Sequence, residues 1–166
     1  MQRIGSWGVV LAVVVVLSAG CGKKASETAS EKMIESAMRA QGQNADVTIN
    51  SETMQVKTKD GDMSFGEGTK LPENWPDDVQ VYTGLKLLSA MKTKEGFSIQ
   101  GTTTDALDKV AAFYKEQLAT SGWAEDTVMT QPQMTMLSYK KDKRTMVVVI
   151  GGQDAETSVS ITINSE

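Results

Sequence analysis

The residues able to carry chemistry are few. The most distinctive is Cys21, the single cysteine in a chain of 166 residues that contains no histidine. A lone cysteine cannot form a disulfide within the chain. A zinc site built from the usual cysteine and histidine ligands is excluded, as is any catalytic triad or dyad that uses histidine. The reactive inventory reduces to carboxylates, lysines, hydroxyl groups, thioethers and one thiol.

Cys21 follows an N-terminal segment with the layout of a secretory signal. Arg3 and the α-amine give a positive start, the run from Trp7 to Leu17 is apolar or glycine, and small residues at 18–20 precede the cysteine. This order predicts a signal peptide over residues 1–20. The run is shorter than the roughly 20 residues that cross a bilayer. A single transmembrane anchor is the alternative.

The stretch from Leu17 to Cys21, LSAGC, resembles the lipobox of bacterial lipoproteins. The resemblance implies that Cys21 is the lipid attachment residue, that the peptide before it is removed, and that the new amine is acylated. The usual pattern has leucine where Ser18 stands here. Gly22 rather than aspartate comes next, which in enteric-type lipoproteins favours the outer over the inner membrane. The other interpretation is a free or buried thiol, but an exposed thiol is a liability in an exported protein.

Paired carboxylates could perform general acid/base catalysis. The candidates Asp77-Asp78, Glu125-Asp126 and Asp154 lie in predicted turns, where carboxylates are normally solvated. We therefore expect no catalytic residue and no enzymatic activity.

Two further motifs contain residue types that can bind ions or nucleotides. The turn at 60–62, Asp-Gly-Asp, does not have the spacing of an EF-hand. Gly-Glu-Gly at 66–68 lacks the third glycine and the following helix of a nucleotide loop. Neither predicts a site, and no metal or cofactor is expected.

Three methionines cluster in the stretch VMTQPQMTM, at Met129, Met134 and Met136. Thioethers suit soft ions such as Cu(I). However, residues two apart on a strand share one face, and methionine fills irregular cores well. Core packing is therefore the favoured interpretation, with copper as the alternative.

The N-terminal half supplies short elements. Residues 21–30 are small and polar and read as a flexible tether. Ser30 could cap a helix over 31–41 that ends at Gly42. Residues 46–66 alternate apolar and polar side chains and predict a three-stranded meander. A connector at 67–84, rich in proline and glycine, follows. We expect three of its apolar side chains to hold it against the core: Trp75, Val79 and Tyr82.

Residues 85–166 carry the clearest periodicity. Two strands precede a helix that Asp105 could cap, with Asp108 favouring its positive end. Gly122 should end that helix, and further strands complete the order β-β-α-β-β-β. The helix carries one apolar stripe, which Phe113 widens: Leu107, Val110, Ala111, Tyr114 and Leu118. The economical fold is α+β, a two-layer antiparallel sheet under one main helix. The earlier helix and meander would extend this layer or form a smaller neighbour.

A second resemblance covers residues 71–166 and, more loosely, 31–66. The stretches LPENWPDDVQVYTGLKLLSA and DKVAAFYKEQLATSGW resemble a group of small bacterial lipoproteins of uncharacterised function. The shared motifs are turns, core aromatics and a helix end, so they imply a fold and no chemistry. The layout also resembles the lipoprotein subunit of the outer-membrane β-barrel assembly machine, a likeness of fold alone.

The net charge of −4 argues against a nucleic-acid partner. We expect a lipid-anchored, non-catalytic envelope lipoprotein that binds a protein or has a structural role, with its folded part in the periplasm. The membrane partner would be reached through the lipid, and an envelope protein would be the second partner. The alternative is a carrier of small apolar ligands in a groove between helix and sheet.

Overall fold

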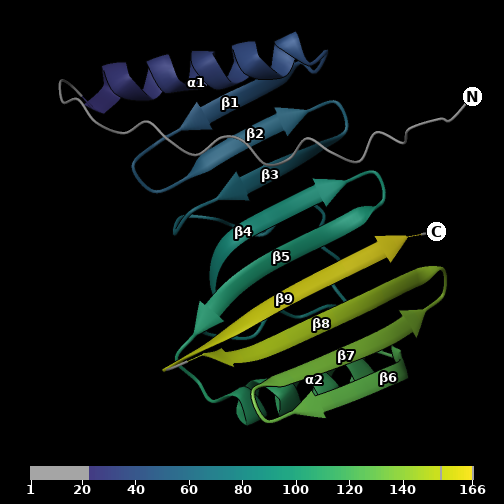
Figure 1. Ribbon diagram of the computed structural model, residues 1–166. Helices are drawn as coiled ribbons and strands as arrows, with labels where there is room; N and C mark the ends of the chain where they lie inside the picture. The colour runs from purple at the N-terminus through teal and green to yellow at the C-terminus, as the bar shows by residue number, and fades with distance from the viewer. Residues whose placement is uncertain (1–22, 154, 166) are drawn as a thin grey trace, which may run out of the picture.

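The computed structural model describes residues 23–153 and 155–165 (Figure 1). Cys21, the signal segment and Asp154 lie outside the described residues. Within the described ranges the chain forms two helices and nine strands: α1 Lys23–Ala40, β1 Ala45–Ile49, β2 Met54–Thr58, β3 Gly61–Phe65, β4 Lys86–Thr93, β5 Gly96–Thr103, α2 Leu107–Thr120, β6 Ala124–Gln131, β7 Met134–Lys141, β8 Arg144–Gln153 and β9 Glu156–Ser165.

All nine described strands join one antiparallel sheet, in the order β1-β2-β3-β4-β5-β9-β8-β7-β6. The C-terminal strand β9 returns to the middle of the sheet and pairs with both β5 and β8. The meander extends the C-terminal layer, because β3 pairs with β4 through pairs such as Met63 with Met91. The α+β class and the antiparallel sheet are therefore confirmed.

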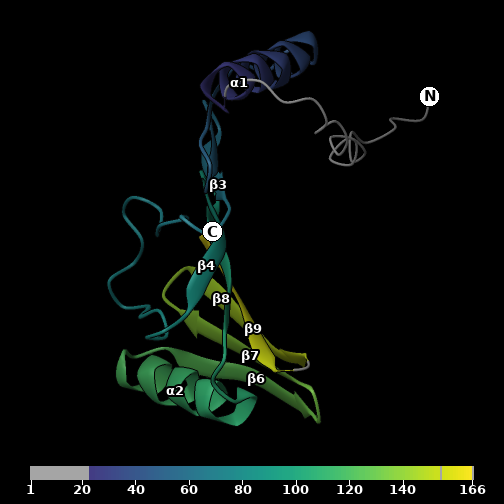
Figure 2. The same cartoon turned by 90° about the vertical axis from the view of Figure 1, so that its left-hand side faces the viewer.

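Helix α2 covers one face of the sheet at the β6–β9 end (Figures 1 and 2). The predicted stripe is confirmed, since Val110, Tyr114 and Leu118 are at most 1% exposed. They face equally buried residues of the sheet, among them Leu137 and Val148. Burying one large apolar side chain contributes about 1.5–3 kcal/mol relative to exposure, so this layer holds the main core.

The end of α2 also follows the sequence expectation. Gly122 has a φ of 78°, and the amide of Trp123 donates to the carbonyl of Leu118 at 3.0 Å. A left-handed residue at this position ends a helix while satisfying its last carbonyl groups, and glycine adopts it without steric cost.

The structure differs from the sequence-based predictions in four details. Residues 23–30, expected within the tether, are helical, so α1 begins at Lys23. Ser30 does not cap a helix start; its hydroxyl donates to the carbonyl of Ser26 inside α1 at 2.9 Å. Four strands rather than three follow α2. Asp105 is not the cap of α2, because Ala106 precedes the helix without a side-chain cap bond.

Asp105 instead joins the connector to the helix. Its carboxylate accepts hydrogen bonds from the Tyr82 hydroxyl at 2.7 Å and from the Lys109 ammonium at 2.9 Å. These bonds hold the pKa of Asp105 below its ordinary value, with Lys109 the larger cause. A long-range partner thus takes the carboxylate that local preference would use as a cap.

The connector is held against the core as expected. Val79 and Tyr82 are buried, and Trp75 packs beside them. The indole of Trp75 donates to the Val79 carbonyl at 2.7 Å, and the backbone amide of Tyr82 donates to the hydroxyl of buried Tyr114 at 3.1 Å. The connector therefore belongs to the folded unit.

The two faces of the sheet differ from end to end. We call the face opposite α2 the open face. One row of paired residues crosses it: Val47, Val56, Met63, Met91, Ser98, Thr162, Val147 and Ser138. The apolar side of the β1–β3 meander thus lies on the open face, opposite to the apolar side at the α2 end. Helix α1 runs along β1 and is displaced toward the open face (Figure 2).

Candidate functional site

Of the carboxylates named above, Asp78 and Asp126 are held in ion pairs. Asp78 accepts hydrogen bonds from the Arg144 guanidinium, at 3.0 and 2.7 Å, and from Lys141 at 2.7 Å. The Arg144 bond is the largest cause of a pKa lowered to about 2. Asp126 pairs with Lys140 at 2.7 Å on the surface. The first contact fastens the connector to β7 and β8, and a carboxyl so acidic cannot hold a proton near neutral pH.

Ser-x-x-Lys sequences occur at residues 89–92 and 138–141, in β4 and β7. Residues three apart on a strand point to opposite faces of the sheet. The hydroxyl and the amine are therefore separated in both, and Lys141 is engaged by Asp78 and by the Ser121 carbonyl.

The glycine and aspartate turns have structural explanations. Asp60 pairs with Lys59 and Lys94, while Asp62 stands opposite Lys57 and Lys92 in the sheet. Gly66 has a φ of 111°, and a Cβ there would collide with the carbonyl oxygen of Glu52. In the described part of the chain, no group of three or more His, Cys, Asp or Glu side chains is placed to hold a metal ion.

The layer between α2 and the sheet, where the alternative prediction puts an apolar groove, contains the aromatic rings of Tyr114 and Phe113. Tyr114 is fully buried, and burial raises its pKa to about 12. Phe113 packs edge to face against Tyr82 and Tyr114, with ring centroids 5.1 and 5.2 Å apart. Leu107 is partly buried against this core.

A pocket of about 250 Å³ lies elsewhere, between the connector and strands β2–β4. It is lined by Gln55, Lys57, Asp62, Met63, Ser64, Lys70, Leu71, Pro72, Glu73, Ala90 and Lys92. Sequence reasoning missed it, because the walls come from segments up to 37 positions apart whose contact depends on the β3–β4 pairing. Its lining mixes charged side chains of both signs with apolar ones.

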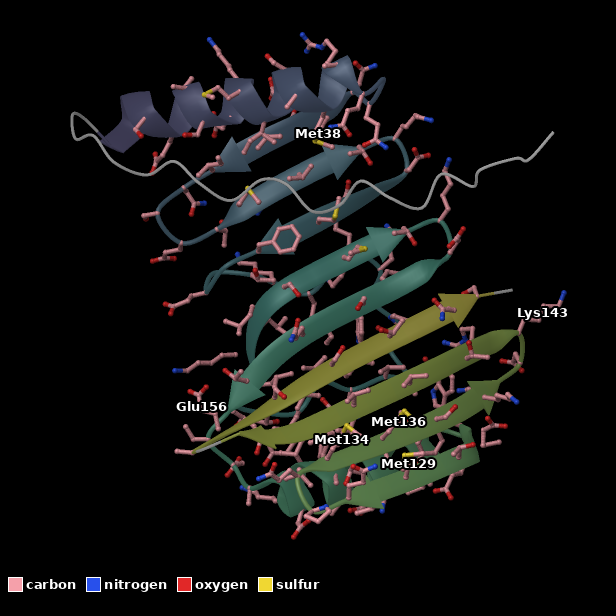
Figure 3. All side chains as sticks on the ribbon, in the orientation of Figure 1. Met38, Met129, Met134, Met136, Lys143 and Glu156 are labelled. Atoms are coloured by element: carbon pink, nitrogen blue, oxygen red, sulfur yellow. The ribbon has the colours of Figure 1, made fainter. Side chains whose placement is uncertain are left out.

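The open face carries most of the methionines. Met129, Met134 and Met136 lie together over β6 and β7, with α2 behind the sheet (Figure 3). A similar group at the other end comprises Met54, Met63 and Met91. The prediction that Met134 and Met136 share one face of the sheet is confirmed. The prediction that these methionines pack in the core is wrong for Met129, which is 44% exposed. The core side of β6 and β7 is instead occupied by Val128 and Leu137.

Between these two groups the open face is lined by small polar side chains. Ser98 pairs with Thr162 across β5 and β9, and Gln100 pairs with Ser160. On β8, Val147 and Val149 add half-buried apolar surface beside the first methionine group. The open face therefore has two apolar ends and a hydroxyl-rich centre.

Comparison with known proteins finds a match for the second half of the chain only. The family model described as START domain-like matches residues 83–164, from the end of the connector to β9. No curated protein and no solved structure matches the chain. Among the described helices, neither is both long and apolar enough to cross a bilayer.

Proposed function

We propose that this chain is a lipid-anchored, non-catalytic binding module of the bacterial envelope that engages a protein partner through its open face. The observation that carries the proposal is the exposure of large apolar side chains there: Met129 at 44%, Phe65 at 38% and Met91 at 37%. Apolar side chains gathered on a surface mark interaction sites. Methionine suits such sites because its flexible, polarisable side chain adapts to a partner.

The proposed anchor would hold the folded part close to the membrane. Helix α1 begins at Lys23, two residues after Cys21. Two residues reach at most about 7 Å. Glu31 and Glu35 of α1 bond to the backbone of β1, so α1 and the sheet would move together. The proposed location is the periplasmic side of the outer membrane, based on Gly22 and the lipobox resemblance.

The anchor is tested by Cys21→Ala in the full chain, with incorporation of labelled fatty acid as the measurement. The variant should lose the label and keep an uncleaved or mislocalised N-terminus. Labelling that persists in this variant would rule out attachment at Cys21.

The partner is tested by photo-crosslinking in cells. A photoreactive amino acid at Met136 or Met91 samples the two ends of the open face, and one at Glu116, exposed on α2, is the matched control. One protein should be captured from both open-face positions and not from position 116. Polar replacement of the neighbouring Met129 should reduce capture at position 136. Equal capture from all three positions would contradict a partner specific to the open face.

A carrier of small apolar ligands is the second candidate, and the START domain-like match favours it because it suggests a ligand-binding fold. Its groove would lie between α2 and the sheet, beside Leu107 and Phe113. A ligand there would have to displace the aromatic contacts of Tyr114. Native mass spectrometry of chain purified from membranes should then show a co-purified apolar molecule that Leu107→Trp excludes. A chain that carries no such molecule would count against the carrier.

A further inference from the structure

The first methionine group has a defined geometry. Met129 on β6 stands directly opposite Met136 on β7, and Met134 lies two residues along β7 on the same face. Directly opposed residues in an antiparallel pair have Cβ atoms about 4.5–5.5 Å apart, and residues two apart on a strand are separated by about 7 Å. Three thioethers thus start within reach of one point above the open face.

These three methionine side chains do not pack in the hydrophobic core. Met129 is 44% exposed, and Met134 and Met136 are half-buried. On the other side of the same strands, Val128 and fully buried Leu137 pack under α2. The three thioethers therefore lie on neighbouring positions of the sheet surface and are not part of the core.

Thioether sulfur is a soft, neutral ligand, and among biological ions it selects Cu(I). It needs no deprotonation to bind, unlike cysteine or histidine ligands. The three flexible bonds of each methionine side chain allow the sulfurs to converge. The Sδ of Met129 is approached by the Gln131 amide at 3.9 Å, a weak and exposed contact that does not lock the side chain.

We infer that Met129, Met134 and Met136 form a binding site for Cu(I) on the open face. A single ion binds through the three sulfurs, and half-buried Val149 of the next strand, directly opposite Met136, borders one side of it. The metal arrives and leaves as Cu(I), so no electron is transferred. This site depends neither on lipid at Cys21 nor on a protein partner.

The second methionine group provides the matched comparison. Met63 and Met91 are directly opposite each other, and Met54, which stands opposite Phe65, is diagonal to Met63 and separated from Met91 by strand β3. Each of its three strands contributes one sulfur, whereas β7 contributes two to the proposed site. Replacing this second group removes the same number of thioethers from the same face.

The test uses the full chain purified in mild detergent, under anaerobic conditions with ascorbate and Cu(I). Competition against the coloured Cu(I) complex of bicinchoninate reports binding. The wild-type chain should withdraw a single equivalent of Cu(I). The triple variant M129L/M134L/M136L should no longer withdraw Cu(I), while M54L/M63L/M91L should withdraw as much as the wild-type chain. Leucine keeps the apolar volume, so folding should survive, and circular dichroism checks this.

A second measurement locates the ion. With Ag(I) as a probe that does not change oxidation state, the methyl NMR signals of Met129, Met134 and Met136 should shift, and that of exposed Met33 should not. The single variant M136L should already weaken retention. Failure of the wild-type chain to withdraw Cu(I), or equal loss in both triple variants, would overturn the site.

Discussion

The carboxylate of Glu31 on α1 accepts a hydrogen bond from the backbone amide of Ile49 on β1, with 2.7 Å between Oε1 and N. One turn further along, the Glu35 carboxylate accepts from the amide of Val47 at 3.2 Å. β1 is an edge of the sheet, and its outward amides would otherwise invite pairing with another chain. Helix α1 closes this edge with side chains instead of a tenth strand.

The double variant E31A/E35A should open the β1 edge. Each lost bond to a charged acceptor should cost about 1–2 kcal/mol of local stability. Native-state hydrogen exchange would show faster exchange of the Val47 and Ile49 amides, with little change in the α2 core. The isosteric pair E31Q/E35Q keeps an oxygen acceptor and should have a smaller effect. Equal effects of both pairs would show that the carboxylates do not act as acceptors.

Asp78 should make stability depend on pH in acid. Its pKa is about 2 in the folded chain and near 3.9 when unfolded, so its contribution is complete above about pH 4. That contribution is lost as the pH falls through about 2. Asp78→Asn should reduce the free energy of unfolding by about 1–2 kcal/mol at neutral pH, allowing for solvent screening. In urea titrations the gap between wild type and variant should narrow from pH 4 to pH 2; a constant gap would contradict the ion pair.

Tyr114 should make the free energy of unfolding fall as the pH rises in the alkaline range. Burial raises its pKa from 10.0 to about 12, so its contribution is complete below pH 10 and is lost as the pH rises through 12. Tyr114→Phe leaves the buried amide of Tyr82 without its acceptor and should cost about 1–3 kcal/mol near neutral pH. The stability gap to wild type should shrink above pH 10. An absorbance titration in which every tyrosine ionises near pH 10 would refute this.

Gly66 and Gly84 allow the cost of a positive φ to be separated from the cost of a steric clash with the backbone. Both have positive φ, 111° and 93°, but only at Gly66 would a Cβ meet a backbone carbonyl, that of Glu52, while nothing lies within 4 Å at Gly84. Gly84→Ala should cost about 1–2 kcal/mol from backbone strain alone. Gly66→Ala should cost more, because the turn before β2 must also move. Thermal unfolding of the two variants compares them, and equal losses would show that the close approach relaxes freely.

Local patterns predicted those elements whose signals lie within one segment. The stripe containing Val110, Tyr114 and Leu118 repeats at the helical period, and Gly122 ends the helix through its own backbone freedom. The alternating side chains of the meander and of β9 identify strands in the same way. These features depend on residues a few positions apart, so the sequence was sufficient for them.

The tertiary structure decided what those elements face. Alternation divides a strand into two faces but does not say which one a helix will cover, and so Met129 and Met136 lie on the open face while Leu137 enters the core. Likewise, Asp105 could cap α2 by local preference, yet Tyr82, 23 positions away, holds its carboxylate. Pairings of this range depend on the whole sheet, which is why the open face was not predictable from the sequence.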